Sequence, residues 1–212
     1  MLYDIAKRTL DLMVALVLFV VFLPAFLIIP ILIKLDSKGP ILAETPKRVG
    51  KDQKLFHMFK FRSMIANAHT LLKTDPKFRQ LYEEYKRGSY KLKHDPRITP
   101  IGRFIRRYSL DELPQIFNVF RGEMSIVGPR AYFPDELKEQ QIVYPETKEY
   151  VRDLLKIKPG ITGYWQVTGR SEINFDKRVK MDSEYACCRS IFQDVLILLK
   201  TPWAMISGKG AF

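Results

Sequence analysis

The sequence predicts a mainly α-helical protein with small β elements, in the α+β class, that carries an N-terminal membrane helix. Three observations support this fold. Residues 12–33 contain no charged side chain. Several later segments repeat apolar residues at the spacing of amphipathic helices, whereas stretches with strand-like alternation are few and short. The apolar fraction of 47% supplies a core, and a chain of 212 residues fits one domain of ordinary size.

The uncharged N-terminal run is long enough to cross a bilayer, yet it is not a simple span. A straight helix of about 22 residues rises about 33 Å. Pro24 lies near the middle of the run and predicts a kink, because proline lacks an N–H donor and clashes with the preceding turn. Basic residues flank both ends, so the positive-inside rule gives no orientation. From the residues alone, a re-entrant anchor and a kinked single span are both open, and a buried helix of a soluble core is disfavoured.

Residues 1–34 are therefore interpreted as a membrane anchor and residues 35–212 as one globular unit. Helices are expected at 63–75, 77–87, 111–120, 135–141, 146–155, 175–188 and 191–206. A short strand is expected within 54–64, loops at 94–102 and 158–171, and mixed turn and extended structure at 121–134. The last apolar segment forms one helix or two helices broken at Pro202, and it belongs either to the core or to the membrane interface.

The charge balance favours an anionic partner, because the formal net charge is +12 at pH 7. Nucleic acid, acidic lipid and phosphorylated substrates all satisfy that balance. The two cysteines, Cys187 and Cys188, are adjacent and imply no disulfide framework. The three histidines lack zinc-ligand spacing, and the sequence contains no Walker, Rossmann or G-x-S-x-G motif.

An acidic pair, Asp111-Glu112, stands out in "SLDELPQ" (109–115) and admits two interpretations. As a helix start, Ser109 and Glu112 form a capping box, or Asp111 is itself the N-cap and Pro114 lies in the first turn; the proline favours the second register. A helix N-terminus would also lower the carboxylate pKa values. As a catalytic site, one carboxylate attacks phosphorus and the other holds Mg²⁺.

Four arginines beside turns or element ends could form a cradle for a polyphosphate, because the guanidinium fork matches phosphate oxygens. They are Arg62, Arg106, Arg130 and Arg170. Taken singly, each is more often a solvated or ion-paired surface residue. The cradle is therefore a hypothesis that depends on these side chains meeting in space.

Several long segments occur in a specific order and together carry a family resemblance. They are "KRTLDL", "KFRSM", "DPRITPIGRFIRRYSLDELPQIFNVFRGEMSIVGPR", "KPGITGYWQVTGRS" and "RVKMDSEY". On these segments the chain closely resembles the bacterial sugar transferases, the monotopic phosphoglycosyl transferases, over essentially all of its length. The helix before the kink differs from many relatives in one respect, since Leu23 stands where they have serine.

The resemblance implies the reaction, the location and the roles of the acidic pair. Such enzymes transfer a sugar 1-phosphate from a UDP-sugar to undecaprenyl phosphate at the cytoplasmic face of the bacterial inner membrane, and UMP leaves. Asp111 corresponds to the nucleophile that forms an aspartyl-phosphosugar intermediate, and Glu112 to the residue that helps to bind Mg²⁺. The hydrophobic segment corresponds to a re-entrant helix kinked at Pro24, below a cytosolic catalytic unit with interfacial amphipathic helices.

The resemblance also implies a substrate-binding set and a donor class. The phosphate- and UDP-binding motifs of the family fall on Lys60, Arg62, Arg106, Arg130 and Arg170, and an acidic position falls on Asp182. The segment 66–93 is longer than in minimal members and resembles the branch that transfers galactose or glucose 1-phosphate for exopolysaccharide or O-antigen synthesis. The alternative is the same reaction with an N-acetylated amino sugar.

Two rivals from other classes are weaker. A membrane-attached nucleic-acid binder would show a basic aromatic platform or a known fold signature, and the sequence has neither. A scaffold with a degenerate site would not need the intact Asp111-Glu112 pair. We therefore expect UDP-sugar, undecaprenyl phosphate and membrane lipid as partners, no nucleic acid, and a homo-oligomer as an open possibility.

Overall fold

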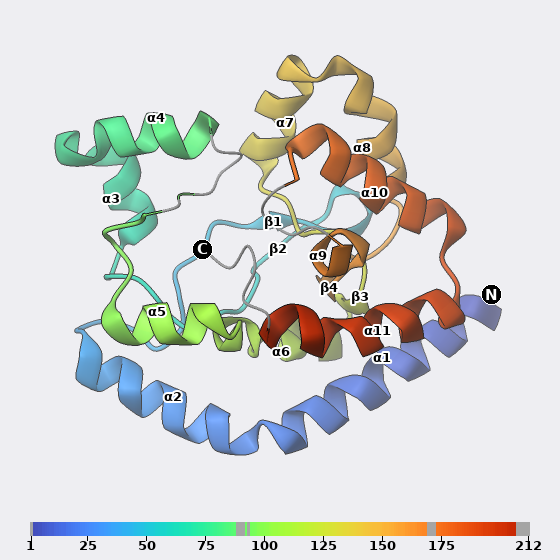
Figure 1. Ribbon diagram of the computed structural model, residues 1–212, viewed down its shortest axis with the longest axis horizontal. Helices are drawn as coiled ribbons and strands as arrows, with labels where there is room; N and C mark the ends of the chain where they lie inside the picture. Colours follow the sequence, from blue (N-terminus) through green and yellow to red (C-terminus); the bar gives the residue numbers. More distant parts are fainter. Residues whose placement is uncertain (1, 88–91, 93, 169–172, 207–212) are drawn as a thin grey trace.

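The computed structural model describes residues 2–87, 92, 94–168 and 173–206 (Figure 1). The α-helices among these residues are α1 (Leu2–Val21), α2 (Leu23–Asp36), α3 (Ala68–Thr74), α4 (Arg79–Arg87), α5 (Pro100–Arg107), α6 (Gln115–Phe120), α7 (Pro134–Val143), α8 (Lys148–Leu154), α9 (Tyr164–Thr168), α10 (Phe175–Cys188) and α11 (Ile191–Ile206). The short 3-10 helices are η1 (Lys51–Gln53), η2 (Pro76–Phe78), η3 (Leu110–Glu112) and η4 (Pro145–Thr147). The strands are β1 (Arg48–Val49), β2 (Leu55–Phe56), β3 (Ser125–Val127) and β4 (Gly160–Thr162). The predicted mainly helical α+β composition is confirmed.

The N-terminal apolar run forms two helices, α1 and α2, that are bent by 60° relative to each other. The break falls at Phe22, two residues before Pro24, which occupies the first turn of α2. Proline has no N–H to donate to the carbonyl of Val20, so the helical ladder is interrupted at this point. Among the described residues, no single helix meets the length and apolarity needed to cross a membrane, and this bent pair meets them only jointly. The kink near Pro24 is confirmed.

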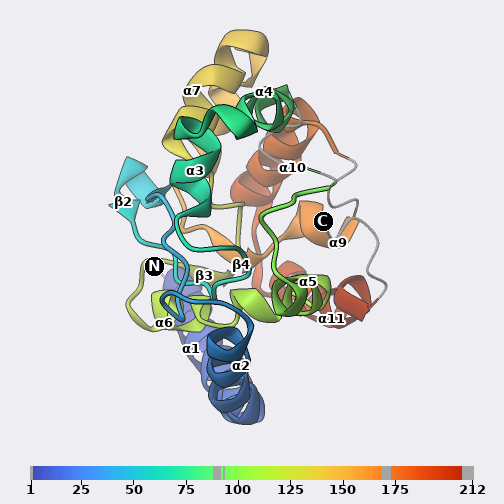
Figure 2. The ribbon, with the colours of Figure 1, turned by 90° about the vertical axis from the view of Figure 1, so that its left-hand side faces the viewer.

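The inner side of the bent pair packs on the globular part of the chain. Ala15, Ile29 and Ile33 are at most 4% exposed, and their neighbours come from β2, β3, α5, α6 and α11. Figure 2 shows both helices along one side of the molecule, with α5, α6 and α11 directly above them. Helices α1 and α2 are therefore an integral layer of the fold, rather than a tail joined by a linker.

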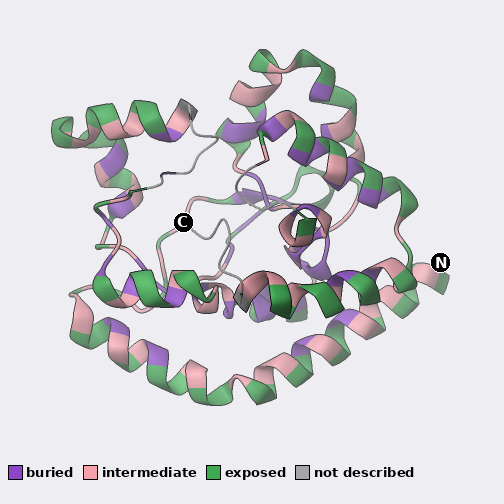
Figure 3. Ribbon diagram, in the orientation of Figure 1, coloured by how far each residue is buried: buried purple, intermediate pink, exposed green. Residues whose placement is uncertain are grey.

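The outer side of the same helices presents a broad apolar surface to solvent, which Figure 3 shows as exposed and intermediate ribbon along α1 and α2. Its large exposed side chains are Leu12, Met13, Leu16, Val17, Val20, Val21, Leu23, Leu27, Ile28, Ile31 and Leu35. On α11, Phe192, Leu199 and Trp203 are each more than 70% exposed. Exposed apolar surface of this extent marks a binding surface for a membrane or a protein.

Two small sheets organise the globular part. Strands β1 and β2 are antiparallel, with Arg48 opposite Phe56, and β3 and β4 are parallel, with Ser125 opposite Gly160. The parallel pair requires close backbone contact, since a Cβ at Gly160 would lie 2.1 Å from the amide nitrogen of Gly128. Gly160 N also donates to Pro129 O at 2.8 Å, which holds the segment that carries Arg130.

The elements expected from the sequence are mostly present. Helices α10 and α11 have the expected bounds, and α11 continues unbroken through Pro202, so the two-helix alternative is wrong. The expectation of a loop throughout 158–171 is also wrong, because this segment contains β4 and α9. Strand β4 has only three residues and pairs through a glycine, so its sequence carries no strand-like alternation.

Candidate active site

The acidic pair shares one lysine. Lys60 Nζ lies 3.1 Å from Asp111 Oδ2 and 3.0 Å from Glu112 Oε1. The residue Asp111 is 4% exposed, whereas the Glu112 side chain is 32% exposed. The backbone fixes the approach of the two segments, since Phe61 N donates to Asp111 O at 2.9 Å. The structure therefore joins Lys60, Asp111 and Glu112 into one charged group with a buried and a solvent-facing carboxylate.

The helix-capping interpretations of this segment are both wrong. Asp111 and Glu112 lie inside η3, whose N-cap is Ser109 with a left-handed φ of 54° and no side-chain capping bond. Pro114 is the N-cap of α6 and lies outside its first turn. The carboxylate of Asp111 is thus held by Lys60 rather than by backbone donors at a helix start.

The pKa of Asp111 differs from the lowered value expected at a helix start. Burial raises the pKa of Asp111, and the negative charge of Glu112 raises it further, although Lys60 and Arg106 oppose this. Burial lowers the pKa of Lys60, but the two carboxylates outweigh burial and the net pKa is raised. Lys60 therefore stays an ammonium ion, which keeps a buried carboxylate compatible with its surroundings. Arg106 belongs to this group by its electrostatic effect on Asp111.

A second polar cluster contains Arg130 and Asp182. The backbone N–H of Arg130 and the hydroxyl of Tyr132 both donate to Asp182 Oδ2 at 3.0 Å. Behind them, Arg178 donates to Glu136 at 2.9 Å, and both of these side chains are at most 1% exposed. Arg130 itself pairs only loosely with Glu136, at 3.9 Å, and its Nε has no hydrogen-bond partner in the described part of the chain.

The carboxyl of Asp182 titrates near neutrality. Burial raises its pKa to about 7, against the two hydrogen bonds from Arg130 and Tyr132 and the charge of Arg178. Its second oxygen, Oδ1, is buried without a partner among the described residues. Asp182 therefore holds the segment from Arg130 to Tyr132 through one carboxylate oxygen, Oδ2.

Arg62 is placed differently from the other candidates. Its guanidinium donates to the carbonyls of Ile33, Ser37, Lys38 and Pro40 and to Ser37 Oγ, at 2.6 to 3.4 Å. These five bonds correspond to the five N–H donors of an arginine. The side chain thus closes the C-terminal end of α2. Arg170 lies outside the described residues.

A buried ion network joins α1 to the globular part of the chain, and sequence reasoning assigned its members no role in the site. Lys7 Nζ lies 3.1 Å from Asp11 Oδ1 and 3.0 Å from Asp194 Oδ2, and both contacts are ion pairs without hydrogen-bond alignment. Asp11 also accepts hydrogen bonds from Ser125 Oγ and Ile126 N in β3.

Arg8, the next residue along α1, reaches the helix that follows the acidic pair. It donates to Val119 O at 2.7 Å and Phe120 O at 3.2 Å, at the C-terminal end of α6. Because α6 follows η3, which carries Asp111, this contact joins α1 to the next helix along the chain from Asp111. The motif "KRTLDL" therefore attaches α1 to the globular part of the chain near the acidic pair.

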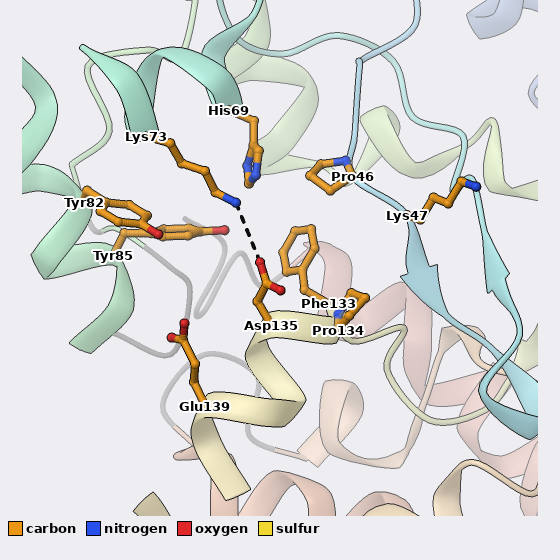
Figure 4. Close-up of a pocket in the computed structure, with 10 residues that line it drawn as sticks. All are labelled: Pro46, Lys47, His69, Lys73, Tyr82, Tyr85, Phe133, Pro134, Asp135 and Glu139. Atoms are coloured by element: carbon orange, nitrogen blue, oxygen red, sulfur yellow. Dashed lines mark ion pairs between the residues drawn. The ribbon is translucent and has the colours of Figure 1, made fainter. Parts of the chain in front are cut away.

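A separate small cavity of about 160 Å³ lies between α3, α4 and the start of α7 (Figure 4). Its walls include His69, Tyr82, Tyr85 and Phe133, and an ion pair between Lys73 and Asp135 at 3.7 Å crosses its edge. Burial lowers the pKa of His69 to about 4, so this imidazole is neutral at pH 7. The volume is below the roughly 300–1,000 Å³ of most small-molecule sites.

The donor set fits a magnesium ion that is bound mainly by substrate and water. Within the described residues, no group of three or more His, Cys, Asp and Glu side chains forms a protein-only metal site. Mg²⁺ commonly uses one or two carboxylates and completes its shell with phosphate oxygens and water. The partly exposed Glu112 carboxylate can supply one such ligand, although Lys60 already contacts one of its oxygens.

Comparison with known proteins identifies the family. A model of the bacterial sugar transferase family matches residues 2–208, and the chain therefore belongs to that family. The chain is 42% identical over 212 residues to an uncharacterized sugar transferase of Haemophilus influenzae, covering 98% of this chain and 42% of that protein. It is 41% identical over 210 residues to the undecaprenyl-phosphate galactose phosphotransferase of Salmonella typhimurium, covering 97% of this chain and 41% of the relative.

A third relative is similar in length. The chain is 37% identical over 212 residues to the exopolysaccharide production protein ExoY of Sinorhizobium fredii, covering 98% of this chain and 88% of that protein. The chain spans about two-fifths of the length of the first two relatives. The predicted membership in a family of sugar transferases is confirmed by these matches.

Proposed function

We propose that this chain transfers a hexose 1-phosphate from a UDP-hexose to undecaprenyl phosphate, with release of UMP. The observation that carries the proposal is the group of Lys60, Asp111 and Glu112, in which a buried carboxylate lies beside an ammonium ion and a solvent-facing carboxylate. The family and the name of the Salmonella relative support the same reaction class. That name favours galactose, and an N-acetylated amino sugar is the alternative donor.

In the first step, a carboxylate oxygen of Asp111 attacks the β-phosphorus of the donor. The new O–P bond forms as the bond between β-phosphorus and the bridging oxygen breaks, and UMP leaves with that electron pair. Lys60 stabilises the carboxylate before attack, since the ammonium lies 3.1 Å from Asp111 Oδ2. Arg106 and Arg130 supply further positive charge for the diphosphate.

In the second step, a phosphate oxygen of the acceptor attacks the aspartyl phosphosugar. A new P–O bond to the acceptor phosphate forms as the acyl-phosphate bond between the Asp111 oxygen and phosphorus breaks. The carboxylate is restored, and the sugar remains on a diphosphate-linked lipid. The ammonium of Lys60 stabilises the regenerated Asp111 carboxylate through the same contact. Bound Mg²⁺, held by Glu112 with phosphate and water, would neutralise diphosphate charge.

The same proposal assigns the bent pair of helices, α1 and α2, a role in membrane binding. The apolar outer surface of α1 and α2 is embedded in the cytoplasmic leaflet of the inner membrane as a re-entrant anchor, and the catalytic unit of residues 35–212 remains in the cytosol. The exposed Phe192, Leu199 and Trp203 of α11 lie at the interface. The ion network of Lys7 and the contacts of Arg8 then hold the site at the depth of the acceptor phosphate.

The test is the release of UMP by the purified chain in lipid nanodiscs. Asp111→Asn should abolish release, and intact-mass measurement after mixing wild-type protein with the donor alone should detect a hexose-phosphate adduct that Asp111→Asn lacks. Asp52→Asn is the matched control, because Asp52 is exposed and has a left-handed φ of 54° that asparagine tolerates. Unimpaired UMP release by Asp111→Asn would refute the assignment. Cysteine labelling of residues on the two flanks of the anchor should report one side of the membrane, and labelling from opposite sides would contradict the re-entrant arrangement.

A further inference from the structure

Arg48 is a buried arginine without an acidic partner. The residue is 9% exposed, its NH1 donates to Ala131 O at 3.2 Å, and its guanidinium carbon lies 3.2 Å above the ring of Phe133. Among the described residues, no carboxylate pairs with it and no acceptor bonds to its Nε. One hydrogen bond and one cation–π contact recover only part of the desolvation cost of a buried cation.

The backbone holds Arg48 next to the known candidates. Strand β1 runs along the segment after Arg130, because Val49 N donates to Tyr132 O at 2.9 Å. Burial and then the positive charge of Arg130 lower the pKa of Arg48 to about 9, and Glu112 is among the acidic groups that oppose this. Arg48 is therefore electrostatically coupled to the Arg130 cluster and, more weakly, to Glu112.

The cluster around Arg48 carries more positive than negative charge. Three guanidiniums, those of Arg48, Arg130 and Arg178, lie around the carboxyl of Glu136, and the carboxyl of Asp182 lies beside Arg130 and Arg178. Glu112 also acts on Arg48, but it is itself ion-paired with Lys60. Because burial raises the pKa of Asp182 to about 7, this carboxyl is only partly ionised at neutral pH. An anion bound beside Arg48 and Arg130 would offset the excess.

We propose that Arg48 binds phosphate oxygens of the nucleotide–sugar donor beside Arg130, an inference that rests on the proposed function. The planar guanidinium offers directional donors that match phosphate oxygens. The ring of Phe133 and the Ala131 carbonyl hold the group in place without neutralising it. Arg48 thus adds a binding residue from β1 to the arginines that the sequence pattern suggests.

Equilibrium binding separates this role from catalysis. In an Asp111→Asn background, which stops turnover, calorimetry in nanodiscs with Mg²⁺ measures the affinities for UDP-galactose, UDP-glucose and UMP. Adding Arg48→Met should weaken binding of UMP and of the preferred UDP-hexose at least tenfold, and Arg48→Lys should retain part of the affinity. Arg152→Met is the control, since Arg152 has a 67% exposed side chain on α8 and should bind like the parent.

Stability distinguishes binding from a structural role. Because Arg48 lacks an acidic partner, Arg48→Met should leave the unfolding temperature of the ligand-free protein unchanged or raise it. Parent-like affinities in Arg48→Met would overturn the proposal, as would a lowered unfolding temperature that accounts for the affinity loss. In the otherwise wild-type chain, a defect confined to the KM of undecaprenyl phosphate would also overturn it. If the wild-type chain binds the donor but releases no UMP, the proposed reaction is refuted. The binding test of Arg48 remains valid in that case.

Discussion

Replacing Lys7 by methionine tests whether the anchor is fixed to the domain by buried charge. The Lys7, Asp11 and Asp194 side chains are 13%, 4% and 0% exposed, with Lys7 Nζ 3.1 and 3.0 Å from the two carboxylates. Methionine retains most of the aliphatic stem and removes the ammonium. Two buried carboxylates would then face each other without a cation.

The expected loss of stability is large for one side chain. Removing one partner of a buried ion pair costs about 3–5 kcal/mol. The lower end, about 3 kcal/mol, is appropriate because Asp11 keeps its hydrogen bonds from Ser125 and Ile126, and Asp194 keeps the one from Tyr185. For a chain of this length, about 3 kcal/mol corresponds to a drop of about 6–12 °C in Tm.

Thermal unfolding followed by circular dichroism in nanodiscs measures the effect. Adding Asp194→Asn to Lys7→Met should restore part of the loss, since it removes one uncompensated charge. Lys156→Met is the control: Lys156 lies 2.7 Å from Asp153, closer than either Lys7 contact, but its side chain is 65% exposed. A Tm loss in Lys7→Met no greater than in Lys156→Met would refute the reasoning.

Two further predictions concern protonation. Lys60→Met removes the main charge that lowers the pKa of Asp111, so the acid limb of the pH profile for UMP release should move to higher pH. Lys60→Arg keeps a positive charge and should leave the acid limb in place. If the profile is unmoved in both variants, Lys60 does not control the pKa of Asp111. Asp182 has a native pKa of about 7 against an ordinary value of 3.8, so its stabilising contribution is present below about pH 4 and is lost as pH rises through 7. The stability difference between wild type and Asp182→Asn should therefore fall across this range, by up to about 1.4 kcal/mol per pH unit in urea unfolding, and parallel pH curves would exclude a raised pKa.

The sequence predicted the elements whose stability is local. Amphipathic spacing identified α10 and α11 with their correct bounds, and Pro24 identified the kink. It failed where structure depends on contact between distant backbones, as in β4, a three-residue strand that exists because Gly160 lies against Gly128. The local sequence pattern does not indicate that two distant backbone segments lie this close together.

The candidate site likewise separates what local sequence predicts from what depends on contacts between distant residues. Asp111 and Glu112 stand out in a local motif, but it is the family resemblance that makes them catalytic candidates. The predicted capping geometry is wrong, because Lys60 approaches from a segment 51 residues earlier and burial raises the pKa of Asp111. Arg48 was missed, since a single arginine in a two-residue strand gives no sign of burial. Lys7 and Asp194 lie near opposite ends of the chain, so their contact could not be inferred from spacing.

The five hydrogen bonds of Arg62 join the end of α2 to the segment that carries Lys60. Arg62 donates to Ile33 O in α2 and to carbonyls of the segment directly after α2, and it lies two residues from Lys60, which contacts Asp111. A shift of α2 along the membrane normal would pull on the lysine through a single short stretch of backbone. In the proposed setting, the depth of α2 in the bilayer and the position of Lys60 are therefore mechanically linked.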